Sequence, residues 1–163
     1  MENEKLPYPI YTPRLKVKHG HDILISFEDV VHMLGENLAT QLKSLSIRLY
    51  IKCAEYAKSR GLILADTKFE FGLDEFWNLY LADEIFTPDS SRIWYAKSFK
   101  LGQHLPSSDK QYLRDYLARK NWNGRSHVNI SNDVISMTRD LFIEVYETLT
   151  GNKFTVFFFP EDS

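Results

Sequence analysis

The sequence of residues 65–94 is ADTKFEFGLDEFWNLYLADEIFTPDSSRIW, and this stretch decides the fold. At its start, hydroxyl or aromatic side chains alternate with charged ones, which is the two-residue period of a strand with one apolar and one charged face. The alternating residues are Thr67, Phe69 and Phe71 on one face and Asp66, Lys68 and Glu70 on the other. The pattern predicts a strand whose charged face is available for chemistry.

A hairpin is predicted from the residues that follow. Residues 72–78 have turn chemistry, and the run 79–86 lies at a distance suited to an antiparallel return. With the turn centred near residues 75–76, part of the second strand shares the charged face of Lys68 and Glu70. The residues predicted there are Leu81, Asp83 and Ile85. This geometry would bring two carboxylates and an ammonium group together.

The predicted cluster of Lys68, Glu70 and Asp83 suits a particular kind of ligand. Paired carboxylates repel each other unless a cation or a proton lies between them, and hard oxygen ligands favour Mg²⁺. A lysine beside them suits a phosphate, and the loop 87–92 adds hydroxyl groups and a guanidinium that can bind phosphate or carboxylate. From spacing alone, ordinary ion pairs on a solvated sheet face explain the same residues.

A resemblance to a known family favours the interpretation of these residues as a ligand-binding site over that of ordinary ion pairs. The motifs that carry it are GLILADTKFEFG at 61–72, LADEIFTPDSSRIW at 81–94, LPYPIYTP at 6–13, GHD at 20–22, DKQYLRDYL at 109–117 and YETLTG at 146–151. Together they cover most of the chain. This pattern resembles phosphoribosylaminoimidazole-succinocarboxamide synthase, the SAICAR synthetase family of purine biosynthesis.

The resemblance implies an ATP-dependent carboxylate–amine ligase that uses Mg²⁺. Its small-molecule substrates would be carboxyaminoimidazole ribonucleotide, whose carboxylate is phosphorylated, and aspartate, whose amine then forms the amide. By the same resemblance, Glu70 and Asp83 hold Mg²⁺ and Lys68 neutralises the transferred phosphoryl group. These three residues are the expected catalytic group.

The remaining site residues also come from the resemblance. The ribonucleotide would be bound by Asp89, Ser91 and Arg92, with Arg92 on its phosphate, and Asp22 would lie on the substrate side. Lys110 and Arg114, four residues apart on one helix, would face the nucleotide together with Lys68; a solvated basic face is the alternative.

The resemblance matches the C-terminal part of the family. The N-terminal lobe, which in the family supplies most of the ATP-binding surface, is expected to be absent from residues 1–163. Two interpretations follow: an incomplete SAICAR synthetase that needs a chain supplying that lobe, or a non-catalytic remnant or partner-binding subunit of the same fold. Because half a cleft loses much of the proximity that catalysis needs, the isolated chain is expected to be inactive.

The composition of the chain bounds the number of domains, the kinds of partner and the cellular location. With 163 residues, 44% of them hydrophobic, the chain is long enough for one domain with its own core. Its 20 basic and 22 acidic side chains give a net charge of −2, which predicts no nucleic-acid or anionic-membrane partner. The single cysteine, Cys53, cannot form an internal disulfide, and no long apolar span is present, so a cytoplasmic location is expected.

The rest of the chain predicts an α+β domain, with helices packed on one side of an antiparallel sheet. Residues 1–20 are expected to be an extended leading segment. His19, His21 and Asp22, at and just after its end, fit a solvated loop better than a transition-metal site. Helices are predicted from the Ser26 cap to Gly35 and over residues 36–60, 109–120 and 132–150. A buried strand is expected at 62–65, and residues 152–163 form an aromatic tail.

Overall fold

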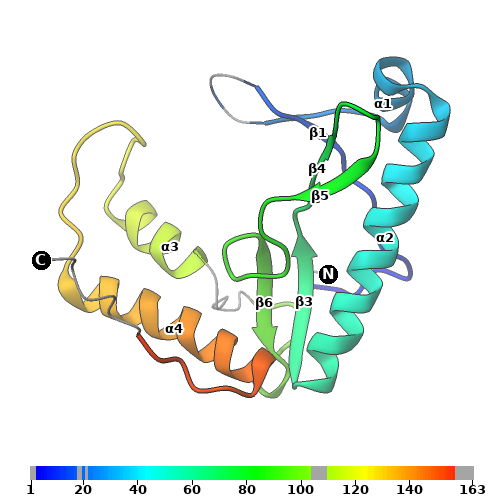
Figure 1. Cartoon of the computed structure of the whole chain (residues 1–163). Helices are drawn as coiled ribbons and strands as arrows, with labels where there is room; N and C mark the ends of the chain where they lie inside the picture. Colours follow the sequence, from blue (N-terminus) through cyan, green and yellow to red (C-terminus); the bar gives the residue numbers. More distant parts are fainter. Residues whose placement is uncertain (1–2, 18–19, 21, 104–109, 157–163) are drawn as a thin grey trace, which may run out of the picture.

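The computed structural model describes residues 3–17, 20, 22–103 and 110–156. The helices are α1 (Phe27–Leu34), α2 (Glu36–Ser59), the 3-10 helix η1 (Ala96–Ser98), α3 (Gln111–Arg119) and α4 (Asn132–Thr150). The strands are β1 (Arg14–Leu15), β2 (Ile23–Leu24), β3 (Leu62–Thr67), β4 (Glu70–Leu73), β5 (Leu79–Ala82) and β6 (Ser91–Tyr95). The predicted α+β class is confirmed, and Figure 1 shows α2 to the right and α4 to the left of the β3–β6 pair.

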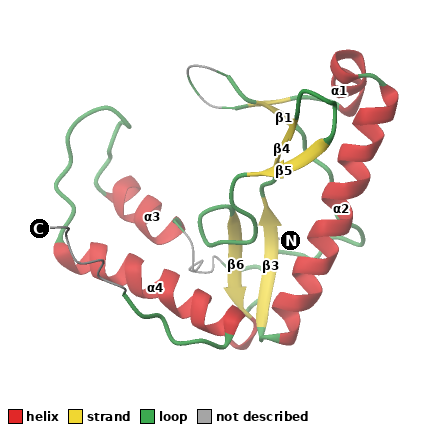
Figure 2. Ribbon diagram, in the orientation of Figure 1, coloured by secondary structure: helices red, strands yellow, loops and turns green. Residues whose placement is uncertain are grey.

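The strands form three separate two-stranded antiparallel sheets instead of one sheet centred on a hairpin. The pairs are β1–β2, β3–β6 and β4–β5 (Figure 2). The predicted first strand breaks after Thr67, so that β3 pairs with β6 while β4 begins the hairpin. The sequence did not predict β6, because its first residues belong to a motif rich in turn-forming residues, although Ile93, Trp94 and Tyr95 favour strands.

The register of the β4–β5 hairpin corrects the predicted charged face. Glu70 lies opposite Ala82, and Phe71 lies opposite Leu81. Because opposite residues point to the same face, Leu81 shares the face of Phe71 and not that of Glu70. The prediction for Leu81 is therefore wrong. The turn is centred on Phe76, half a residue later than expected. This moves the pairing of the two strands by one residue, and a one-residue shift turns every residue of the second strand to the opposite face.

The second strand is also shorter than predicted. β5 ends at Ala82, and Asp83 has a φ of 63°, in the left-handed region. Ile85 therefore lies outside the strand, and the placement of Asp83 and Ile85 on a strand face is wrong. A non-glycine residue at positive φ interrupts the extended backbone that pairing requires. From Asp83 onward the chain turns away from β4 and leads into the loop before β6.

The helices follow their predicted signals closely. Ser26 caps α1 by accepting a hydrogen bond from the backbone N–H of Asp29, whose carboxylate accepts one from the N–H of Ser26, a reciprocal capping box. Gly35 lies between α1 and α2 at a φ of 82°, which only glycine adopts readily. The boundaries of α2 and α4 agree with the predictions to within one residue.

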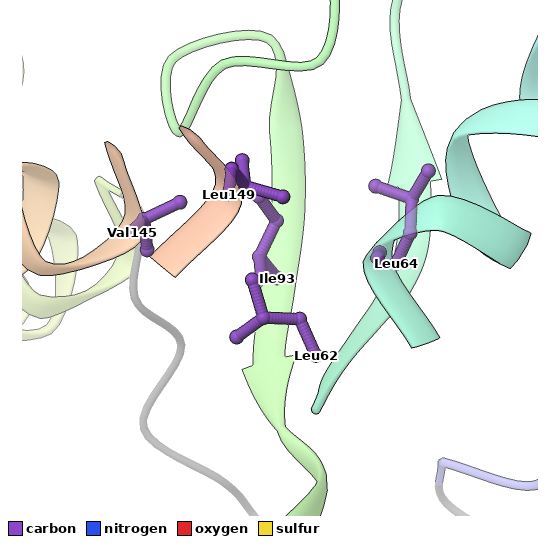
Figure 3. Packing of buried hydrophobic residues seen from close by; sticks show 6 residues of the cluster. Leu62, Leu64, Ile93, Val145 and Leu149 are labelled. Carbon is purple, nitrogen blue, oxygen red and sulfur yellow. The ribbon is translucent and has the colours of Figure 1, made fainter. Parts of the chain in front are cut away.

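The core lies where α2 and α4 meet the β3–β6 pair (Figure 3). Leu62 and Leu64 of β3 and Ile93 of β6 pack with Val145 and Leu149 of α4, and Ala57 of α2 completes the cluster. Leu62, Ile93 and Val145 are fully buried. This small core fixes β6 against β3 and so positions the loops at the ends of both strands.

Some predictions fall on residues outside the described part of the chain. These are His19 and His21 near the end of the leading segment, Asp109 at the start of the helix predicted over residues 109–120, and the end of the aromatic tail from Phe157 onward. At the start of the tail, the ring of Phe154 contacts Tyr146 edge-on, with centroids 5.9 Å apart. Among the described helices, none combines the length and apolar composition of a membrane-spanning segment.

Candidate functional site

A charged cluster lies where β3 gives way to β4. The Lys68 ammonium is 2.5 Å from Oε1 of Glu70, and the Lys16 ammonium is 2.9 Å from Oε2 of the same carboxylate. The side chain of Glu70 is 23% exposed, whereas those of Lys16 and Lys68 are 75% and 56% exposed. Because both lysine side chains are largely exposed, their ammonium groups are accessible to an anionic ligand. Ion pairs this exposed contribute little to folding stability.

The electrostatics of the cluster favour the charged forms of Lys68 and Glu70. Hydrogen bonds from Lys68 and then Lys16 hold the pKa of the Glu70 carboxyl below its ordinary value. The hydrogen bond to Glu70 raises the pKa of Lys68, and the charges of Glu70, Asp22 and Asp83 add to this rise. Asp22 and Asp83 therefore act on the same ammonium group as Glu70, and their roles in a site stay predictions.

The low pKa of Glu70 can be tested by NMR titration of its carboxyl carbon. Replacing Lys68 by methionine is expected to raise the pKa of Glu70 toward its ordinary value, with a smaller rise for Lys16→Met, because Lys68 makes the larger contribution. Lys58→Met, near the end of α2, is the control and should leave the titration unchanged. An unaltered pKa in both cluster variants would contradict this electrostatic description.

The same shift fixes the sign of a pH effect on stability. Because the pKa of Glu70 is lower in the folded chain than in the unfolded chain, its ionised carboxylate stabilises the fold at pH values above its unfolded pKa. This contribution is lost as the pH falls through the lowered pKa. In Lys68→Met the pH-dependent contribution should shrink.

The described residues do not form a ready-made metal cage. Within residues 3–17, 20, 22–103 and 110–156, no group of three or more histidine, cysteine, aspartate or glutamate side chains could hold a metal ion. Mg²⁺ is often held by one or two carboxylates together with phosphate oxygens and water. The binding of Mg²⁺ by Glu70 and Asp83, with a ligand supplying the remaining oxygen atoms, stays a prediction.

The loop between β5 and β6, and β6 itself, each carry one predicted residue that forms an ion pair. The carboxylate of Asp89 forms an ion pair with the Lys110 ammonium, which joins this loop to the start of α3. Within β6, Arg92 lies opposite Asp66 of β3, next to a bulge between Leu64 and Asp66, and the charged groups of Arg92 and Asp66 are 3.3 Å apart. Bulges of this kind often redirect side chains near active sites.

The structure places Ser91 and Arg114 differently from the other site residues. Ser91 is buried, with 4% of its surface exposed, and its hydroxyl lies 2.8 Å from that of Thr67 across the β3–β6 pair. Arg114 is exposed on α3, one turn after Lys110. The roles of Ser91 and Arg114 in binding stay predictions.

The sequence analysis missed two members of the site. Lys16 reaches Glu70 from a segment 54 residues earlier, and Asp66 pairs with Arg92. Asp66 was assigned to a charged face but to no role. No local pattern marks Lys16, because its importance comes only from the contact with Glu70.

Comparison with known proteins identifies the family. The family model described as SAICAR synthetase matches residues 1–129, which include every predicted site residue from Asp22 to Arg114. The chain belongs to the SAICAR synthetase family. The phosphoribosylaminoimidazole-succinocarboxamide synthase of Saccharomyces cerevisiae is 46% identical over 156 residues, covering 94% of this chain and 51% of the yeast protein. The synthase of Corynebacterium efficiens is 48% identical over 161 residues, covering 95% of this chain and 53% of its own length.

Solved structures of SAICAR synthetases agree with this assignment. A SAICAR synthase from Saccharomyces cerevisiae complexed with SAICAR superposes with a TM-score of 0.81 at 44% identity, covering 95% of this chain and 50% of that one. A SAICAR synthetase (Type-2) in complex with ADP gives a TM-score of 0.71 at 25% identity, covering 96% of this chain and 57% of that one. The chain spans about half the length of the curated relatives that it matches.

Proposed function

We propose that this chain forms one side of the active site of a phosphoribosylaminoimidazole-succinocarboxamide synthase, an ATP-dependent ligase of purine biosynthesis. The substrates would be ATP, carboxyaminoimidazole ribonucleotide and aspartate. One observation carries the proposal: two exposed ammonium groups, from Lys16 and Lys68, meet on the carboxylate of Glu70 in a chain of the SAICAR synthetase family. The ADP and SAICAR complexes of two similar structures support the choice of ligands.

Mg²⁺ belongs to the proposal because the oxygen donors fit it. Glu70 and Asp83 would hold the ion jointly with phosphate oxygens, since the described residues alone do not supply enough ligands. When bound, the ion neutralises negative charge on the phosphates. The Lys68 ammonium, kept protonated by its hydrogen bond with Glu70, would stabilise the transferred phosphoryl group from the protein side.

The proposed reaction has two steps. In the first, the carboxylate oxygen of the ribonucleotide attacks the terminal phosphorus of ATP, the bond to the bridging oxygen breaks, and ADP leaves. In the second, the aspartate amine attacks the resulting acyl phosphate, loses a proton and expels phosphate, leaving an amide. Arg92 and Asp89 would orient the ribonucleotide, and Lys110 and Arg114 would face the nucleotide.

We propose that a polypeptide carrying the rest of the family fold completes the site. The chain exposes 12662 Å², whereas a compact protein of 19.1 kDa is expected to expose about 8,400 Å². Two-stranded sheets are also marginally stable when isolated, and the described residues form three of them. Both observations indicate surface that another part of the fold covers. A cytoplasmic location is proposed as well, consistent with the free thiol of Cys53.

A complementation assay tests this function. The chain is mixed with a polypeptide that carries the remaining half of a relative, such as the Saccharomyces cerevisiae synthase, and supplied with ATP, Mg²⁺, carboxyaminoimidazole ribonucleotide and aspartate. We expect little or no product from either part alone and amide formation from the mixture. Chromatography of the product measures the amide.

The controls separate the proposed function from the alternatives. The full-length yeast synthase shows that the substrates and conditions are adequate. Product formed by the isolated chain would contradict the proposal that a second half is needed. A mixture that assembles, as seen by sedimentation, yet forms no product would favour a non-catalytic, partner-binding subunit.

A further inference from the structure

The turn between β4 and β5 exposes two neighbouring aromatic side chains. Phe76 and Trp77 are 75% and 78% exposed, and among the exposed large hydrophobic residues of the described chain only Tyr8 is more exposed. Exposed aromatic residues that stand together on a surface mark interaction sites more often than scattered ones. We call Phe76 and Trp77 the aromatic turn. The chemistry of the charged cluster does not use these residues.

The backbone of the aromatic turn is held firmly in place. One oxygen of the Asp74 carboxylate accepts hydrogen bonds from the N–H groups of Phe76 and Asn78, at 2.9 and 2.7 Å. The other oxygen accepts one from the Asn78 amide at 2.9 Å. The hydrogen bond from the Asn78 side chain makes the largest contribution to lowering the pKa of Asp74. The backbone hydrogen bonds from Asn78 and Phe76 lower it further, which favours the ionised carboxylate. A turn fixed in advance loses little conformational entropy when its aromatic residues dock.

A groove lies directly beside the aromatic turn, between α2 and β5. It is a shallow groove open to solvent, with a volume of about 360 Å³, and is lined by Thr40, Gln41, Ser44, Leu45, Arg48 and Leu79. Leu45 and Leu79 provide the apolar surface of this groove, and the other lining residues are polar or charged. Leu79 is three residues from Phe76 along the chain, and Figure 1 shows the hairpin running beside α2. The space is sufficient for an aromatic side chain.

The charges of the turn and the groove are opposite. Asp74 and Glu75 make the turn acidic, whereas Arg48 is an exposed cation in the groove and has no hydrogen bond or ion pair within the described part of the chain. A two-fold dimer requires a single patch that is complementary to itself. An acidic aromatic turn next to a basic groove meets that requirement. The acidic residues also disfavour an anionic membrane surface as the occupant.

We propose that the chain forms a two-fold homodimer in which the aromatic turn of each copy occupies the α2–β5 groove of the other. In this arrangement Phe76 and Trp77 contact Leu45 and Leu79 of the second copy. Glu75 of each copy lies near Arg48 of the other, and the interaction occurs twice because of the symmetry. The proposed ligase activity is not required for this dimer.

Sedimentation of the full chain over a range of concentrations tests the proposal. The unaltered chain is expected to dimerise at micromolar concentration. The double variant Phe76→Ser, Trp77→Ser should weaken the dimer by at least about 100-fold, because central aromatic residues dominate such interfaces. The control carries Tyr8→Ser and Ile10→Ser, which are 79% and 66% exposed on the leading segment, and should dimerise normally.

A charge exchange provides the decisive second measurement. Glu75→Arg and Arg48→Glu should each weaken the homodimer by about 10-fold, because like charges then meet at both contacts. When these two variants are mixed, every contact again joins opposite charges, so a heterodimer should form with nearly the original affinity. Circular dichroism confirms that each variant is folded.

The outcomes are distinct. Restored association in the mixture establishes the exchange of turns between copies. A chain that remains monomeric at all concentrations would overturn the proposal. So would a dimer that survives loss of both aromatic side chains, or variants whose mixture fails to associate.

Discussion

Replacing Ile93 by alanine is expected to lower the free energy of unfolding by about 3 kcal/mol, a large part of the stability of a domain this size. Ile93 is fully buried, and it belongs to the cluster that joins β3, β6, α2 and α4. The substitution removes apolar contacts from all of these elements and leaves a cavity. Urea unfolding followed by circular dichroism measures the loss.

The matched control is Ile23→Ala on β2, where the side chain is 54% exposed. It should change the unfolding free energy by less than about 1 kcal/mol, because little apolar surface returns to water. Equal losses in the two variants would show that the cluster around Ile93 is not the main core.

A second consequence follows from the position of Ile93 beside Arg92. Loosening β6 should also weaken the pairing of Arg92 with Asp66 across the two strands.

Glu70→Gln is expected to lower the ligation rate of the complemented assembly by about 10²–10³-fold, the range found when one preorganised electrostatic group is removed. The physical reason is the position of the Glu70 carboxylate between two ammonium groups. A neutral amide of the same shape cannot balance both positive charges, and its single carbonyl oxygen is a poorer ligand for Mg²⁺. Initial rates with saturating substrates measure the effect.

The control for this substitution is Glu75→Gln. Glu75 is an exposed glutamate in the turn of the same hairpin, and its replacement should leave the rate unchanged. A Glu70→Gln assembly with the normal rate would refute the role proposed for the cluster. Binding of the two halves and circular dichroism establish that the variant is folded and assembled, so that a lower rate reports on chemistry.

The dependence of the ligation rate on Mg²⁺ concentration distinguishes two proposed functions of Glu70: binding the ion and positioning Lys68. If the carboxylate binds the ion, Glu70→Gln should require more Mg²⁺ for half-maximal rate. If it mainly positions Lys68, the Mg²⁺ requirement should stay constant and the KM for ATP should rise. Lys68→Met then serves as the reference, because it removes the ammonium group and keeps the carboxylate.

The comparison between sequence and structure is clearest in the β4–β5 hairpin. The alternating pattern located the hairpin and its turn correctly, yet the face assigned to Leu81 was wrong. Sequence patterns place a turn to within about a residue, whereas the face of every residue in a strand depends on the register. The pairing of β3 with β6 was missed for a related reason, since it joins segments that the intervening hairpin separates.

The sequence by itself determined the family resemblance, the α+β class, the helices and their caps, and the residues from which a site could be built. These features depend on local propensities, periodicity and motifs, which are written in neighbouring residues. Only the tertiary structure decided which of those residues meet. It brought Lys16 to Glu70 across 54 residues, Lys110 to Asp89, and Asp66 to Arg92 through a bulge. Contacts between distant segments depend on how the chain packs, and no local pattern encodes them.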